Sequence, residues 1–371
     1  MNSKKTDTGV ATNKIRLLKL HGTPYDRGYQ HGAAYKDDIH RYVEERVGLV
    51  CDGRWSGGPL PREEVLAVAD SCMPDHEAYA PDLVEEMRGM AAATGLSMAE
   101  LLIVSGFTDF VDTVYATFKD KQPVPARLPL DDCTAFLVPN DAAEGAAFFG
   151  QTWDMHDTAT EFVILLEIAP DNGPKAIVFT TVGSVGQIGM NEHGICIGIN
   201  NLLGADGQVG VTWPFVVRKG LQQDNIEDAL ACVTEAKLSG AHNYLIMDKD
   251  GRGYNVEAMS THQYITELGD KIVTHTNHCL VPETLALQQT RLPVAQTSSE
   301  NRLNKANELL QQRPVTIDAL IELTRSDPIC TLSYPPFNVE TCGAAIMRPK
   351  TGDFWAVWGL PSENEYEHFT L

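Results

Sequence analysis

The sequence predicts a layered α+β fold in which two β-sheets are covered by helices. Three observations predict it: the first third of the chain has helical periodicity, the chain beyond Cys133 has strand periodicity, and helices divide the strands into two groups. With 371 residues, 43% hydrophobic and 21% charged, the chain can bury a substantial core in one large domain or two.

Helical periodicity dominates the first third. Apolar residues recur at helical spacing over 25–50, and an acidic segment at 62–90 has a similar pattern. Ser97 and Glu100 form a capping box, which predicts a helix from there to about residue 118. The polar, proline-rich stretch 119–129 is expected to be a surface loop.

Strand periodicity begins after Cys133. Short turns such as 171–174 link the segments, so neighbours should pair antiparallel. The expected strands are 134–138, 146–153, 162–168, 175–182, 186–191, 194–201, 243–248, 253–259, 263–267, 271–276, 342–348 and 353–358. Helices are expected at 212–222, 225–237, 298–312 and 316–325.

Charge and cysteine usage exclude several classes of protein. A net charge of −21 argues against nucleic acid or an anionic membrane as partner. The eight cysteines are scattered, without the close pairs of a disulfide framework or a CxxC spacing. Neither a secretory signal nor a long apolar run is evident, so we expect a cytoplasmic protein.

Cys133 is the candidate nucleophile. It lies where the helical part ends and the strands begin, which is the layout of a self-cleaving enzyme whose nucleophile becomes an N-terminal residue. Cleavage before such a residue frees an α-amine, which then serves as the catalytic base. The alternative is a small buried cysteine at the start of a strand.

Two polar residues could assist the thiol. Asp154 should end the strand that pairs with the one beginning at Cys133, so its carboxylate could return close to the cysteine; alternatively it ends a strand at the surface. Asn277 could stabilise the oxyanion that forms when a thiol attacks an amide, or it could bond its own backbone in a turn.

A metal site is conceivable at His275, His278 and Cys279. Three potential ligands lie within five residues, but no companion cluster completes a four-ligand set. We therefore expect no metal and no cofactor.

Five motifs together resemble peptidase family C45, the penicillin acyltransferase-like N-terminal nucleophile hydrolases. They occur in family order over nearly the whole chain: Gly22–Gly32, Cys133–Phe136, Gly150–Asp154, Gly189–Gly194 and His275–Leu280. The resemblance implies a four-layer αββα sandwich of the N-terminal nucleophile type. It also implies cleavage before Cys133 into a helical N-terminal segment (1–132) and a catalytic core (133–371).

Roles for individual residues also follow from the resemblance. Cys133 would be nucleophile and base, Asp154 the acidic residue that organises the site, and Asn277 the oxyanion donor. Thr341 keeps the hydroxyl of a family serine, but Cys342 stands where the fungal acyltransferase of this family has an arginine. Arg302 or Arg291 could supply that cation. Asp132, in place of the usual glycine before the nucleophile, is a second departure.

The expected function is amide hydrolysis of a small N-acylated compound through a Cys133 thioester. An acyltransferase using acyl-CoA is the alternative, although no basic phosphate-binding loop is evident. An inactive relative that only binds a small ligand is a second alternative. The expected partners are the small-molecule substrate and the chain's own cleaved N-terminal segment, in an α/β heterodimer that could assemble further.

Overall fold

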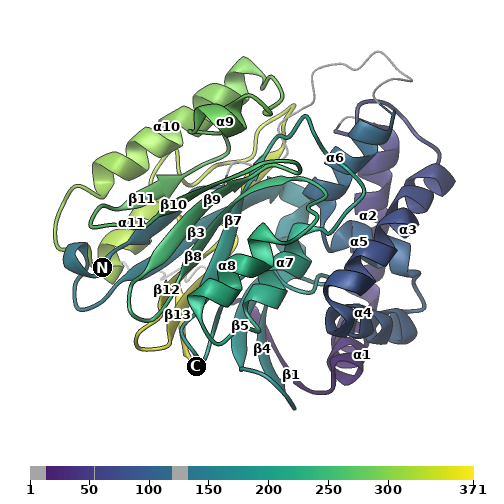
Figure 1. Cartoon of the computed structure of the whole chain (residues 1–371), viewed down its shortest axis with the longest axis horizontal. Coiled ribbons are helices and arrows are strands. Elements are labelled where there is room, and N and C mark those ends of the chain that lie inside the picture. Colours follow the sequence, from purple (N-terminus) through teal and green to yellow (C-terminus); the bar gives the residue numbers. More distant parts are fainter. Residues whose placement is uncertain (1–13, 54, 119–132) are drawn as a thin grey trace, which may run out of the picture.

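Two stacked β-sheets form the centre of the protein in a computed structural model that describes residues 14–53, 55–118 and 133–371 (Figure 1). One sheet has eight strands in the order β1-β4-β5-β6-β7-β8-β9-β10, and the other has six in the order β11-β2-β3-β12-β13-β14. The strands of the larger sheet are β1 (Arg16–Gly22), β4 (Val163–Pro170), β5 (Ala176–Thr181), β6 (Ile188–Asn191), β7 (Cys196–Leu202), β8 (Ala241–Met247), β9 (Gly253–Ala258) and β10 (Gln263–Glu267). Those of the smaller sheet are β2 (Ala135–Val138), β3 (Phe148–His156), β11 (Val273–His275), β12 (Val339–Arg348), β13 (Asp353–Trp358) and β14 (Glu367–Thr370).

Helices cover the outer face of each sheet, so the four-layer αββα arrangement is confirmed. The larger sheet carries α7 (Trp213–Gly220) and α8 (Ile226–Thr234), and α10 (Pro293–Leu309) and α11 (Ile317–Arg325) pack on the smaller one. A short α9 (Pro282–Leu285) precedes α10. The N-terminal helices form a separate group beside the sheets (Figure 1). They are α1 (Pro24–Ala34), α2 (Lys36–Asp52), α3 (Arg62–Tyr79), α4 (Pro81–Thr94), α5 (Met98–Val104) and α6 (Phe107–Phe118).

The main core fills the space between the two sheets and continues among the N-terminal helices. Side chains alternate along each strand, so one face of a strand points into this core. Phe149, Gln151 and Trp153 of β3 face the larger sheet, where Gln151 bonds both backbone groups of Ile199 at 2.8 and 2.9 Å. Phe148, on the opposite face, packs beneath α10 and α11. This alternation fixes which face of β3 each side chain of the site occupies.

The structure corrects several expected boundaries. The helix expected over 97–118 begins with the predicted Ser97 capping box but breaks after Val104. At the break, a Cβ on Gly106 would lie 2.5 Å from Cβ of Thr212, so the chain passes too close to α7 for a larger residue. The helical patterns at 25–50 and 62–90 each correspond to two helices.

The N-terminal segment is not purely helical, contrary to expectation. Its strand β1 pairs in parallel with β4 of the catalytic core over seven residues, from Arg16↔Ile164 to Gly22↔Pro170. Most strands that follow one another in the sequence pair antiparallel as predicted, such as β2 with β3 and β4 with β5. The exceptions include β3 and β4, which are joined by a 3-10 turn at Asp157–Phe162, and β10 and β11; the members of each of these pairs lie in different sheets. The expected loop 119–129 lies outside the described residues.

Candidate active site

Cys133 lies directly before β2, at the edge where β2 and β3 begin to pair. The hairpin register places Ala135 opposite Gln151, and Thr134 and Thr152 exchange two further bonds of 3.1 and 2.9 Å. The backbone of Asp154 therefore lies beside the cysteine: its N–H donates to Sγ of Cys133 at 3.4 Å. The thiol in turn donates to the Asp154 carbonyl oxygen at 3.7 Å. A donor aimed at sulfur favours the thiolate form that attacks a carbonyl.

Asp154 does not end its strand at the surface. β3 continues to His156, and Asp154 is completely buried within it, opposite Thr341 of β12. The surface alternative is therefore wrong.

Thr341 lies in the strand next to Asp154 and anchors a loop to the site. Its Oγ1 accepts the backbone N–H of Thr331 at 2.9 Å, and its own N–H donates to the Thr331 carbonyl oxygen at 2.9 Å. A bulge then follows, because the register shifts between Thr341 and Gly343. Cys342 occupies the bulge, completely buried, and burial raises the pKa of its thiol above the usual value.

Asn277 and Arg302 face each other across the site. Nη2 of Arg302 donates to Oδ1 of Asn277 at 3.0 Å, which turns the amide nitrogen of Asn277 the other way. That nitrogen donates one hydrogen to the Asn201 carbonyl oxygen at 3.1 Å. The Asn277 backbone N–H donates to Ser299 Oγ at 2.9 Å, so the residue is held by the protein around it rather than by its own turn.

Arg302 brings a buried positive charge to the nucleophile. Its Nη1 donates to the carbonyl oxygen of Cys133 at 2.6 Å and to Oγ1 of Thr134 at 3.1 Å, and its side chain is completely buried. Of the two arginines considered for the missing cation, Arg302 contacts the site. Arg291 instead lies near His278 and Cys279, close enough for its charge to act on both groups.

The sequence contained a signal for Arg302. The inward face of α10 consists of Ala295, Ser299, Arg302 and Ala306, at spacings of four, three and four residues. A single arginine among small residues on the buried face of a helix indicates a buried charge, and such a charge needs polar partners inside the protein.

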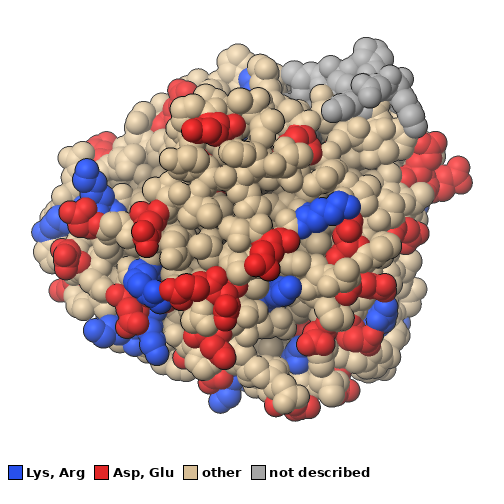
Figure 2. Space-filling model, in the orientation of Figure 1, with Lys and Arg blue, Asp and Glu red and all other residues tan. Residues whose placement is uncertain are grey.

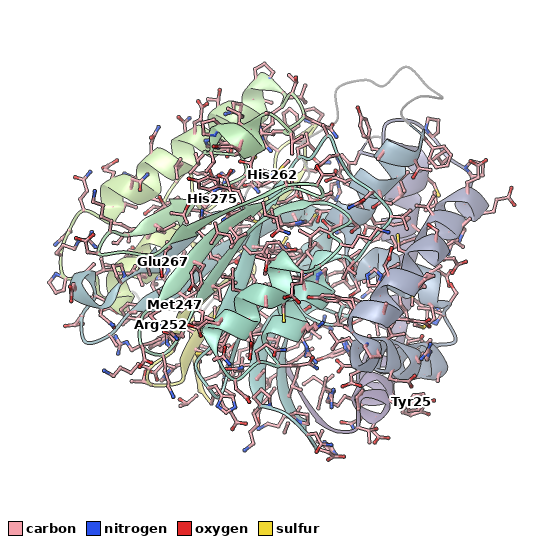
Figure 3. The ribbon with its side chains drawn as sticks, viewed as in Figure 1. Tyr25, Met247, Arg252, His262, Glu267 and His275 are labelled. Atoms are coloured by element: carbon pink, nitrogen blue, oxygen red, sulfur yellow. The ribbon has the colours of Figure 1, made fainter. Side chains whose placement is uncertain are left out.

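The three candidate metal ligands do not converge. Nε2 of His275 lies 2.9 Å from Oε1 of Glu257, and its Nδ1 lies 2.8 Å from the Thr276 carbonyl oxygen. His275 is thus buried among the strands (Figure 3) with both ring nitrogens facing acceptors. His278 Nδ1 lies 2.7 Å from Ser299 Oγ, and Cys279 contacts the Met259 sulfur at 3.9 Å. Within the described ranges no group of three or more His, Cys, Asp or Glu could hold a metal ion.

Seven other cysteines are poor nucleophiles, because burial raises the pKa of each thiol. The pKa rises to about 11 for Cys232 and about 12 for Cys279. The same cause acts on Cys51, Cys72, Cys196, Cys330 and Cys342.

A pocket of about 560 Å³ opens beside this group of residues, between α10 and the loop that follows α11. Its walls adjoin the site on two sides. Ser298 accepts from Nε of Arg302 at 3.4 Å, and Thr331 is bonded to Thr341. The lining is mostly apolar or neutral: Pro293, Val294, Thr297, Ser298, Asn301, Asp327, Pro328, Cys330, Thr331, Leu332 and Tyr334.

The surface and the helices give two further observations. On the face drawn in Figure 2, acidic and basic side chains are interspersed. Among the described residues no single helix has the length and hydropathy to cross a membrane; only the bent pair Pro81–Thr94 and Met98–Val104 passes that test jointly.

Known proteins resemble this chain over most of its length. Residues 141–362 match the family model described as acyl-coenzyme A:6-aminopenicillanic acid acyl-transferase. The 40 kDa form of acyl-coenzyme A:6-aminopenicillanic-acid-acyltransferase from Emericella nidulans is 25% identical over 269 residues, which cover 71% of this chain and 69% of that protein. An uncharacterized protein of Archaeoglobus fulgidus is 26% identical over 264 residues, 64% of this chain and 42% of that protein.

Solved structures with distant similarity include a bile acid hydrolase and a penicillin V acylase. A mutant of conjugated bile acid hydrolase from Clostridium perfringens aligns with a TM-score of 0.42 and 10% identity, covering 64% of this chain and 97% of that one. Penicillin V acylase from Agrobacterium tumefaciens aligns with a TM-score of 0.35 and 11% identity, covering 67% of this chain and 81% of that one.

Proposed function

Because the chain belongs to the acyl-coenzyme A:6-aminopenicillanic acid acyl-transferase family, we propose that it is a self-processing cysteine hydrolase of small N-acylated compounds. The observation that carries the proposal is the contact between Sγ of Cys133 and the backbone N–H of Asp154. At the same strand edge, Arg302 bonds both the Cys133 carbonyl oxygen and Asn277. Nucleophile, buried carboxylate, side-chain amide and cation are the groups that acyl transfer through a thioester requires.

Processing comes first in this proposal. The Cys133 thiol attacks the carbonyl carbon of Asp132, and the Asp132–Cys133 C–N bond breaks to give a thioester and a free α-amine on Cys133. Water then hydrolyses the thioester, which releases Asp132 as a carboxylic acid and restores the Cys133 thiol. Asp132 lies outside the described residues. The N-terminal segment stays bound after the cut, because β1 is hydrogen-bonded along β4 and its helices share the main core.

The α-amine then takes the thiol proton, and the thiolate attacks the substrate amide carbonyl. Asn277 donates from Nδ2 to the oxyanion, while Asp154 stabilises the ammonium of Cys133. The C–N bond breaks, the amine leaves with the ammonium proton, and an acyl thioester remains on Sγ. Water attacks this thioester and releases the acid and the free thiol.

The pocket beside α10 suits the acyl part of the substrate. Val294, Leu332 and Tyr334 offer apolar surface next to residues bonded to the site. Asp327 is the one charged residue in the described lining, so this pocket offers no cation to the phosphates of coenzyme A. We therefore favour an amide donor and water as acceptor, with acyl transfer to an amine as the alternative that the family supports.

The experiment is a search for the acyl-enzyme. The purified protein is mixed with a panel of N-acyl amino acids, β-lactams and other N-acyl amines, and the mass of the Cys133-containing chain is measured within the first turnovers. A mass increase equal to the acyl group, absent in Cys133→Ala, is the expected result. Amine release without any adduct, and undiminished in Cys133→Ala, would contradict the proposal. Added amine acceptors distinguish transfer from hydrolysis by the products formed.

A further inference from the structure

The N-terminal motif Gly22–Gly32 is not part of the site around Cys133. Tyr25, labelled in Figure 3, marks its position on α1, on the opposite side of the view from His275. The motif packs α1 tightly against α4. A Cβ on Gly28 would lie 1.6 Å from the Glu86 carbonyl oxygen, and one on Gly89 would lie 2.1 Å from that of Tyr25. This close packing buries Arg27 next to Glu86.

Two buried arginines share that single carboxylate. Nη2 of Arg27 and Nη2 of Arg218 lie 3.0 and 3.1 Å from Oε2 of Glu86. Arg27 and Arg218 are each 3% exposed, and Glu86 is 1% exposed. Two guanidinium groups against one carboxylate leave one positive charge in excess, and an excess charge away from water is costly.

The nearby His31 adds no charge to this group of side chains. Its Nε2 accepts the backbone N–H of Gly183 at 3.2 Å, so that nitrogen carries no hydrogen. Burial lowers the pKa of His31 to about 4, which leaves the ring neutral near pH 7.

A pocket opens over these arginines. It has a volume of about 250 Å³ and lies between the N-terminal segment and the core, against the turn that joins β4 to β5. Arg27 and Arg218 both line it, together with Asp82 and the turn residues Asn172 and Gly173. Nη1 of Arg218 is buried and has no hydrogen-bond partner within the described part of the chain. Because a buried guanidinium donor without a partner is destabilising, this nitrogen calls for an acceptor from outside the chain.

We propose that this pocket binds a small oxyanion, held by Arg218 and Arg27, which links the N-terminal segment to the catalytic core. Sulfate, phosphate and a carboxylate share the required chemistry: a negative charge with several acceptor oxygens that match the guanidinium fork. Asp82 lies at the exposed rim and opposes the anion, although water screens its charge. The anion would hold the two segments together without taking part in the reaction.

The test is isothermal titration calorimetry of the purified protein with sodium sulfate, sodium phosphate and sodium acetate at matched ionic strength. Saturable binding of at least one anion to the wild type is expected. Asp82→Asn removes an exposed opposing charge and should tighten that binding by about two- to fivefold. Asp270→Asn, a matched exposed carboxylate outside the pocket lining, should leave the affinity unchanged.

Arg218→Met should weaken binding by at least about tenfold, whereas Arg252→Met, at an exposed arginine outside the pocket lining, should not. If Arg218→Met does not fold, the anion affinities of Asp82→Asn and Asp270→Asn still test whether the anion binds in this pocket. The absence of saturable binding for all three anions would overturn the proposal. Equal affinities in the wild type and Asp82→Asn would overturn it as well.

Discussion

Arg302 binds the carbonyl oxygen of Cys133 at 2.6 Å with one terminal nitrogen and Oδ1 of Asn277 at 3.0 Å with the other. One guanidinium therefore fixes both the backbone of the nucleophile and the orientation of the amide expected to meet the oxyanion. The two residues that it joins are 144 positions apart in the sequence, at 133 and 277. Because Arg302 acts through these residues, it is a positioning residue.

Replacement of Arg302 should slow turnover more than it weakens substrate binding. Arg302→Met removes charge-assisted hydrogen bonds worth about 1.5–3 kcal/mol, so kcat should fall by about ten- to a hundredfold with little change in KM. Arg302→Lys should recover only part of the rate, since lysine cannot bind both partners as a fork. Lys305→Met, on the same helix, serves as control. A larger change in KM than in kcat would assign Arg302 to substrate binding instead.

Asp154→Asn should keep the fold but lower kcat by at least about tenfold, because a neutral amide cannot balance the ammonium of Cys133. Steady-state kinetics on protein of confirmed fold measure the effect, with the exposed Asp141→Asn as the matched variant. Unchanged kcat in Asp154→Asn would remove this residue from the mechanism.

Asn277→Ala should lower kcat by about a hundredfold or more with KM nearly unchanged, since an oxyanion donor acts mainly in the transition state. The exposed Asn304→Ala is the control. The same assays with a chelator and with metal analysis test the alternative: stoichiometric zinc and chelator-sensitive activity would favour a metal hydrolase.

Burial of His76 should make the stability of the protein depend on pH. Its Nε2 accepts the Thr212 backbone N–H at 3.0 Å, while its Nδ1 lies 2.9 Å from the Cys72 carbonyl oxygen. The ring is therefore neutral, and burial lowers its pKa to about 4. Between about pH 6.5 and 4 the unfolded chain binds a proton that the folded chain does not, so the free energy of unfolding falls as the pH falls.

Urea unfolding between about pH 7 and 5 measures this effect. One such histidine contributes a slope of up to about 1.36 kcal/mol per pH unit, and His76→Gln should remove it. His262, labelled in Figure 3, is exposed, so His262→Gln should leave the slope unchanged. An identical slope in the wild type and His76→Gln would contradict the prediction.

Local patterns predicted much of this fold because they depend on neighbouring residues. The Ser97–Glu100 capping box is present, and the β2–β3 hairpin brought Asp154 to Cys133 as its spacing indicated. Strand β1 was missed because it is a half-exposed edge strand whose parallel partner, β4, is more than a hundred residues away. The contacts of Arg302 also join distant segments, so its helical stripe could indicate burial but not which atoms it would bind.

The central claim is that Cys133 becomes an N-terminal nucleophile, and the most direct measurement is the intact mass of the purified protein with N-terminal sequencing. The wild type should give two chains of about 14.5 and 26 kDa, the shares of 132 and 239 residues in a 371-residue chain of 40.7 kDa. The larger chain should begin at Cys133, and Cys133→Ala should remain one uncut chain. A wild-type protein that turns over substrate as a single full-length chain would contradict the account.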